Sequence, residues 1–230
     1  VGYADIRRCV FDSMADMGEE FVRLNSQLVK MRPDDMLRGL EGAYPLLARI
    51  RSECPFVAYE MIRRSSATCV LSMSIMLRSW NASRCEVPAP TGGGAVHLAQ
   101  NLTDDEANTV IRFLKCAQAG FGLDKEYQRL WTALNLTLCM WLYRRIVLSQ
   151  YSVKTRLIND AMFTKCLMSL SANTKYLDFL VGRASLGDHR SPTYGWIKKL
   201  FTARLELEAC KKPNLPAPAW AHVYTKLPRT

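Results

Sequence analysis

Residues 130–149 read LWTALNLTLCMWLYRRIVLS, which is the most apolar and least interrupted run of the chain. A helix through this run is apolar on nearly every side, because apolar residues recur at helical spacing and others fill the opposite side. Such a helix is typical of a protein core, and we expect the rest of the chain to pack around it. The pattern predicts that four side chains in particular are buried: Trp131, Leu134, Leu138 and Trp141.

This run is not expected to cross a membrane. Its apolar part ends at Tyr143, which makes it shorter than the roughly 20 residues that a membrane-spanning helix needs, and Asn135 interrupts it. Residues 1–17 contain five charged side chains, so they are not expected to act as a signal peptide. Because there is no initiator methionine, we expect the chain to be an excised or processed piece.

A step in charge divides the chain near its middle. Residues 1–115 contain 14 lysines and arginines and 14 aspartates and glutamates, whereas residues 116–230 contain 17 and 7. The second half therefore carries the whole net charge of +10. Such a surplus favours an anionic partner, and the alternative is a solubility excess spread over solvated helix faces.

The spacing of apolar residues and the helix start and stop signals predict an all-α fold. Thr103 and Glu106 form a capping-box motif, the sharpest local signal of the chain. We find no convincing alternating strand pattern and no internal repeat. The helical segments we expect are 3–17, a second one ending near Met31, 33–40, one from Pro45, 55–80 with a division at 63–66 as an option, 103 to 120 or 122, 130–149, 152–170 with a break near Asn159, 173–181 and 194–210.

Four parts are predicted along the chain. They are a charge-neutral N-terminal helical lobe (1–84), a Pro/Gly-rich inter-lobe loop (85–102), a basic C-terminal helical lobe (103–210) and an extended arm (211–230). The arm interleaves four prolines with aromatic and aliphatic residues, a composition that cannot form its own core but is too aromatic for an idle tail. We expect the arm to dock, on its own domain or on a neighbouring copy, through Leu215, Trp220 and Tyr224.

The eight cysteines favour a reducing compartment. They are evenly scattered without zinc-binding spacing, and most stand beside apolar residues, where a free thiol behaves as a small core hydrophobe. Three N-glycosylation motifs begin at Asn81, Asn101 and Asn135, but the third lies inside the expected core helix, so chance explains them better. We therefore expect an intracellular location: cytoplasm or nucleus, or the virion if the protein is viral.

The sequence contains no motif that clearly indicates an enzyme. Ser185, Asp188 and His189 fall in one loop, yet the groups of a catalytic triad usually come from separate elements, so a polar turn explains them better. The glycines at 92–94 lack the Gly-Lys-Ser/Thr continuation of a phosphate-binding loop. We predict a protein that is not an enzyme and has no metal or cofactor. A carboxylate site assembled across helices is the enzymatic alternative, because it leaves no short motif.

The basic half also contains aromatic side chains among its cations. Cations neutralise phosphates with release of counterions, and aromatic rings stack on unpaired bases. This mixture predicts binding of single-stranded RNA through its backbone, with Tyr151, Tyr194 and Trp196 as stacking candidates. We expect Arg144 and Arg145 to be exposed where the basic surface begins. The full set of candidate phosphate-contacting residues is Arg144, Arg145, Lys154, Arg156, Lys165, Lys175, Arg183, Arg190, Lys198 and Lys199.

Two hypotheses follow from these patterns. The first is a non-enzymatic RNA-binding or packaging protein that forms a homo-oligomer through its C-terminal arm. In outline this architecture resembles viral nucleoproteins of helical type, although no motif matches residue by residue. The second is a helical adaptor or structural assembly subunit that binds protein partners through the arm, with its positive half facing an acidic partner.

Overall fold

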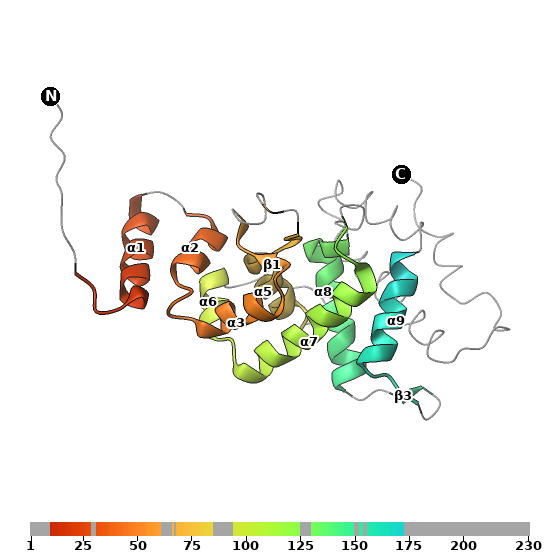
Figure 1. Ribbon diagram of the computed structural model, residues 1–230. Helices are drawn as coiled ribbons and strands as arrows, with labels where there is room; N and C mark the ends of the chain where they lie inside the picture. Colours follow the sequence, from red (N-terminus) through yellow and green to blue (C-terminus); the bar gives the residue numbers. More distant parts are fainter. Residues whose placement is uncertain are drawn as a thin grey trace, which may run out of the picture.

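The computed structural model describes residues 10–28, 31–60, 66, 68–84, 94–124, 130–149, 152–153 and 156–172. This part of the chain is mostly α-helical, as predicted, and its few strands are two residues long (Figure 1). Its helices are α1 (Met14–Leu28), α2 (Pro33–Gly39), α3 (Pro45–Glu53), α5 (Met73–Ala82), α6 (Ala95–Gln100), α7 (Asp104–Phe121), α8 (Ala133–Leu142), the π-helix η2 (Tyr143–Leu148) and α9 (Asp160–Ser171).

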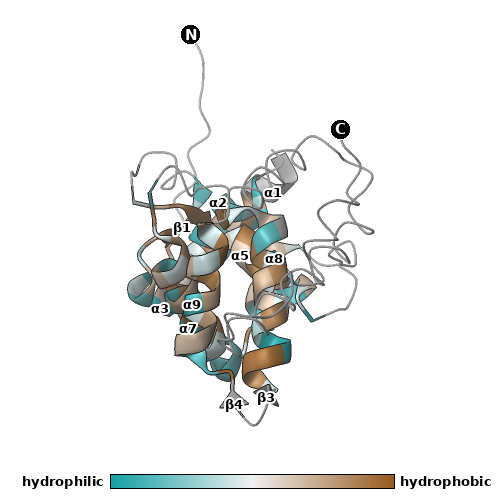
Figure 2. Cartoon of the chain, turned by 90° about the vertical axis from the view of Figure 1, so that its right-hand side faces the viewer, coloured by the Kyte–Doolittle hydropathy of each residue, from teal (hydrophilic) through white to brown (hydrophobic). Residues whose placement is uncertain are grey.

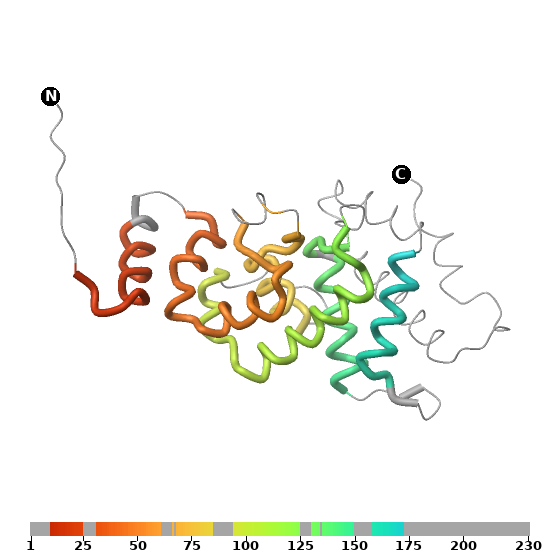
Figure 3. The backbone as a smooth tube through the Cα atoms, viewed as in Figure 1, coloured from red at the N-terminus to blue at the C-terminus, as the bar shows by residue number. Residues whose placement is uncertain are grey.

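Helix α1 lies at one end of the molecule and α9 at the other, and α6 lies back beside α2 (Figures 1 and 3). Helix α7 packs along α9, and α5 packs along α8. The α7–α9 contact is close because Gly120 has no side chain: a Cβ placed there would lie 2.5 Å from the Cβ of Leu167. Figure 2 shows the hydrophobic colour of α8 beside α5.

Helix α8 is the core element that the apolar run predicts. Every side chain from Asn135 to Tyr143 is buried, and so is Trp131 just before the helix. Three of the four predicted core side chains are therefore confirmed, and the side chain of Leu134 lies outside the described residues. The burial of Asn135, whose amide donates to the Leu130 carbonyl at 2.6 Å, agrees with a glycosylation motif that matches by chance.

Several helix ends form where their capping residues predict them. The Thr103 hydroxyl accepts a hydrogen bond from the Glu106 amide at 3.3 Å, and α7 ends before Gly122, which has a positive φ of 73°. The predicted break at Asn159 is the start of α9, where the Asn159 side chain accepts from the Met162 amide at 3.0 Å. Helix α2 begins at Pro33, again as predicted.

The structure corrects four predicted segments. The expected helix over 55–80 is wrong in its first part, where β1 (Val57–Ala58) pairs in parallel with β2 (Leu71–Ser72) before α5 begins. The expected helix after Ser152 is instead an antiparallel pair of β3 (Ser152–Val153) and β4 (Arg156–Leu157). Helix α6 lies inside the predicted loop 85–102, and the single helix α1 runs through the predicted boundary after residue 17. Short apolar runs do not distinguish strand from helix by periodicity, which accounts for the first two errors.

Asp34 connects α2 to the start of α5. It is buried, and its carboxylate accepts bonds from the Ser74 amide at 3.0 Å and from the Ser74 hydroxyl. A carboxylate at this position satisfies an amide in the first turn of α5 and lies favourably in the field of that helix end.

The burial of Trp141 in α8 predicts a large loss of stability when it is truncated. Trp141→Ala should lower the free energy of unfolding by about 3–5 kcal/mol, since it removes a large buried ring and leaves a cavity. Urea denaturation followed by circular dichroism measures this change. Met168→Ala, which truncates a side chain that is 52% exposed, is the control and should change it by about 0.5 kcal/mol or less. Equal losses for the two variants would contradict the core position of α8.

The Asp34–Ser74 contact predicts coupled losses. Asp34→Ala should lower the free energy of unfolding by about 1–3 kcal/mol, because it leaves the buried Ser74 groups without their acceptor. Ser74→Ala in the Asp34→Ala background should then cost less than it does in the wild type. A double-mutant cycle by urea denaturation measures the coupling. Asp35→Ala, the adjacent acidic residue, is the control, and purely additive effects of the Asp34 and Ser74 changes would exclude the contact.

Candidate nucleic-acid interface

The predicted Arg144-Arg145 site lies on the π-helix η2 that continues α8. The Ser149 amide donates to the Arg144 carbonyl at 3.2 Å, the five-residue spacing of a π-helix. Such segments are rare and often occur at functional sites. Three consecutive side chains of η2 (Tyr143, Arg144 and Arg145) reach three different surroundings.

Tyr143 turns inward and ties η2 to two other helices. It is fully buried, and its hydroxyl donates to Asp160 Oδ1 at 2.7 Å. Arg112 of α7 donates to the same carboxylate through Nε at 3.2 Å and Nη2 at 3.0 Å. Burial, followed by the bond to Asp160, raises the pKa of the Tyr143 hydroxyl, so it stays protonated and donates at all physiological pH values. Tyr143 therefore cannot stack on a base.

Arg144 is half-buried, so the prediction that it is exposed is wrong. Its guanidinium lies 3.3 Å from the centroid of the Trp80 ring. Its Nε donates to Ser83 Oγ at 2.9 Å, and its Nη2 lies 3.4 Å from the Trp80 carbonyl. The cation–π contact and these neutral acceptors hold the side chain against α5.

The surroundings of Arg144 also lower the pKa of its guanidinium group. Burial, with a smaller contribution from the nearby positive Arg84, lowers the pKa of Arg144 to about 10, well below the ordinary value of an arginine. Arg144 stays charged at neutral pH. The cost of holding this charge in the fold is fully present below about pH 10 and is relieved as the pH rises above that value. Arg84 itself pairs with Glu106, a neighbourhood that only the tertiary structure brings together.

Arg145 and Lys165 meet the expectation for a surface site. Both side chains are exposed, and the Arg145 guanidinium lies 5.6 Å from the centroid of the Trp141 ring. Arg145 projects from η2 and Lys165 from α9, which pack against each other. These two side chains are the part of the predicted site that the structure places on the surface.

The remaining predicted residues lie outside the described side chains. Arg156 belongs to β4, but only its backbone is described. The other predicted phosphate-contacting residues outside the described part are Lys154, Lys175, Arg183, Arg190, Lys198 and Lys199. The same holds for the stacking candidates Tyr151, Tyr194 and Trp196, and for the arm residues Leu215, Trp220 and Tyr224.

The described residues offer little material for other kinds of site. Within them, no three histidine, cysteine or acidic side chains gather as a metal site would require. Four of the described cysteines are buried, as the prediction of core thiols requires: Cys54, Cys116, Cys139 and Cys166. Among the helices that the structure describes, none has the length and apolar character to span a membrane.

Comparison with protein-family models, with curated proteins and with solved structures gives no significant match. We therefore infer function from the charges and contacts of this chain.

The bond between Tyr143 and Asp160 predicts a specific loss of stability. Tyr143→Phe should lower the free energy of unfolding by about 1.5–3 kcal/mol, because a buried hydrogen bond to a charged group is removed while the ring is kept. Thermal and urea denaturation measure the loss. Tyr44→Phe is a matched control, since the Tyr44 hydroxyl only accepts an exposed bond from Gln100. If both phenylalanine variants were equally stable, the Tyr143 hydrogen bond would not contribute to the stability of the fold.

Proposed function

We propose that this protein is a non-enzymatic RNA-binding protein that holds single-stranded RNA by its phosphate backbone and assembles with further copies of itself. A two-lobed architecture and a docking arm over residues 211–230 are part of this proposal. The observation that carries it is the unequal way in which the two halves of the chain use their charges.

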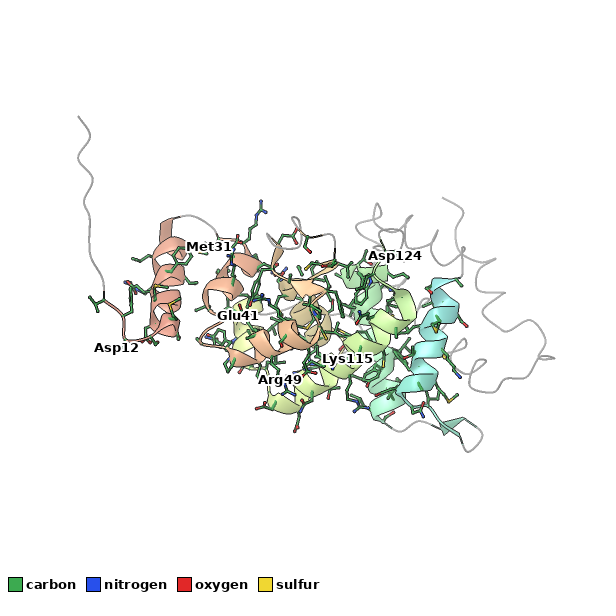
Figure 4. All side chains as sticks on the ribbon, viewed as in Figure 1. Asp12, Met31, Glu41, Arg49, Lys115 and Asp124 are labelled. Carbon is green, nitrogen blue, oxygen red and sulfur yellow. The ribbon has the colours of Figure 1, made fainter. Side chains whose placement is uncertain are left out.

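Among the described residues, most cations of the first half pair with carboxylates of the fold. Arg49 and Lys115 both pair with Glu53, at 3.4 Å and 2.7 Å, where α3 meets α7 (Figure 4). Arg51 pairs with Glu41 at 2.6 Å. Further pairs join Arg23 to Glu20 and Arg84 to Glu106. The balanced half therefore presents little net field to a distant anion.

The second half has few carboxylates, and the fold uses one of them. Arg112, a cation of the first half, pairs with Asp160 at 3.0 Å. This pairing takes one of only seven acidic residues away from the basic half. Arg145 and Lys165 remain exposed on η2 and α9, two elements that pack against each other. A polyanion is the ligand that such a surplus suits best.

RNA is favoured over an acidic protein because the cations are distributed along the chain rather than grouped as one patch. A phosphate backbone presents evenly repeated charges and can contact cations from several elements. Arg145 lies near an aromatic ring that supports its guanidinium, and this arrangement leaves the positive group at the surface. Binding through the backbone requires no base-reading motif.

The proposal predicts RNA binding that weakens steeply with salt. The double variant Arg145→Glu/Lys165→Glu should bind a single-stranded RNA oligonucleotide more weakly, and its salt slope should fall by about 1 for each lost phosphate contact. Fluorescence anisotropy at several salt concentrations measures both quantities. Arg38→Glu is the matched control, because it reverses an exposed cation on α2 in the neutral half.

Three outcomes would contradict the proposal. They are absence of RNA binding at low salt, an equal loss in the Arg38→Glu control, and a salt slope that the double variant leaves unchanged. The ratio of absorbance at 260 and 280 nm, taken after purification without nuclease, separates RNA from the alternative of an acidic protein partner. A raised ratio supports RNA, and a copurified acidic protein supports the adaptor function.

A further inference from the structure

Helix α1 presents an apolar stripe to solvent. We define the α1 stripe as Val10, Met14, Met17 and Leu24, which are 85%, 73%, 40% and 44% exposed. The spacing of three and seven residues places Met14, Met17 and Leu24 on one side of the helix, and Val10 lies four residues before the helix begins. Phe21 is 52% exposed and borders the stripe where α1 meets Gly39 of α2. A contiguous exposed apolar surface of this kind marks an interaction site.

The stripe is not the side by which α1 joins its own fold. A Cβ on Gly18 would collide with the Gly39 carbonyl of α2, and a Cβ on Gly39 would lie 3.0 Å from Val22 Cγ2. Ala15 lies close to Gly42 in the same way. These contacts show that α1 uses its Ala15, Gly18 and Val22 side to pack on α2. Helical geometry places the stripe beside this packed side.

Acidic residues border the stripe on its other edge. Asp16 and Glu20 follow it around the helix, and residues 10–28 contain four acidic side chains against the single basic Arg23. Glu20 is engaged by Arg23 at 2.5 Å, while Asp16 is exposed. A partner that fits this surface therefore combines large apolar side chains with positive charge.

Residues 211–230 of the same sequence have this combination. The segment contains four lysines and arginines and no acidic residue, and it carries Leu215, Trp220 and Tyr224 among its prolines. Its charge complements α1, and its apolar side chains match the stripe. Prolines prevent it from forming a helix of its own, so it can lie extended along a helix surface.

The choice of a second copy follows from the self-assembly in the proposed function. The described chain ends after α9, at the far end of the molecule from α1 (Figures 1 and 3), and residues 173–210 separate that point from the arm. A segment of that length is long enough to reach either copy, so self-assembly, and not reach, assigns the arm of one copy to α1 of the next. Contacts of this head-to-tail kind repeat from copy to copy and build rings or filaments.

We propose that the α1 stripe of one copy receives residues 211–230 of the next copy. This inference rests on the self-assembly in the proposed function and assigns the surface that the arm occupies. It requires no change in how RNA is bound by the basic half.

Cross-linking in the full-length chain tests the proposal. Met14 is replaced by the photo-cross-linking residue p-benzoylphenylalanine, and this protein is mixed with ¹⁵N-labelled wild type at a salt concentration that permits exchange of copies. After illumination, mass spectrometry should find position 14 joined to ¹⁵N peptides from residues 211–230. The same replacement at Glu19, exposed on the other side of α1, is the control and should give no such product.

A second test measures the mass of the assembled protein in solution. Met17→Glu/Leu24→Glu should lower the weight-average mass toward that of one chain, 26.1 kDa, and so should Trp220→Ala/Tyr224→Ala. Combining the two pairs should give no further loss. Because the packed side of α1 is untouched, the circular dichroism melting curve should keep its midpoint in the α1 variant.

Several results would overturn the proposal: cross-links only to ¹⁴N peptides of the same chain, cross-links to a second α1, or a wild type that stays at the mass of one chain. RNA anisotropy on the same samples separates this from the proposed function. If RNA still binds but position 14 does not cross-link to residues 211–230 of a second copy, only the docking surface is overturned. If that cross-link forms but RNA does not bind, only the RNA proposal is overturned.

Discussion

The constraint on which this structure depends is the apolar circumference of α8. A helix that is apolar on one side can lie at a surface, but one whose side chains are buried from Asn135 to Tyr143 needs neighbours all round. Helix α5 covers one side, and η2 joins α8 to the α7–α9 pair. Polar groups that the helix brings into the interior are satisfied there, as when Asn135 bonds the Leu130 carbonyl. Charged side chains can therefore occur only at the ends of this helix.

At its C-terminal end, α8 changes into a π-helix, and the chemistry changes with it. Tyr143 completes the core, Arg144 crosses to Trp80 of α5, and Arg145 reaches solvent. The same six residues thus hold the α7–α9 pair and carry a surface cation. The Asp160 carboxylate connects these roles, because it binds Tyr143 and neutralises Arg112 at the same time. Stability and surface charge are therefore set by one small group of residues.

The sequence predicts the features that depend on local chemistry and misses those that depend on distant partners. The start of α7 at Thr103, the break at Asn159 and the buried face of α8 all follow from capping groups or periodicity. The short parallel pair β1–β2 does not, because two-residue strands carry no periodic signal. The position of Arg144 could not be predicted either, since its partner Trp80 lies more than sixty residues earlier. Of the candidate phosphate-contacting side chains, the structure describes three: Arg144 is half-buried, contrary to the prediction, and Arg145 and Lys165 are exposed.

The Asp34 contact has a consequence for the order in which the chain folds. Helix α5 has a local capping residue, since the Ser72 hydroxyl accepts from the Ile75 amide, but its Ser74 groups find their acceptor 40 residues away in α2. Closing a loop of that length costs entropy before any contact rewards it. The first turn of α5 therefore reaches its final stability only when α2 has docked. Docking of α2 and completion of the helix that packs along α8 are in this way energetically coupled, so a change in the N-terminal helices reaches the core through Ser74.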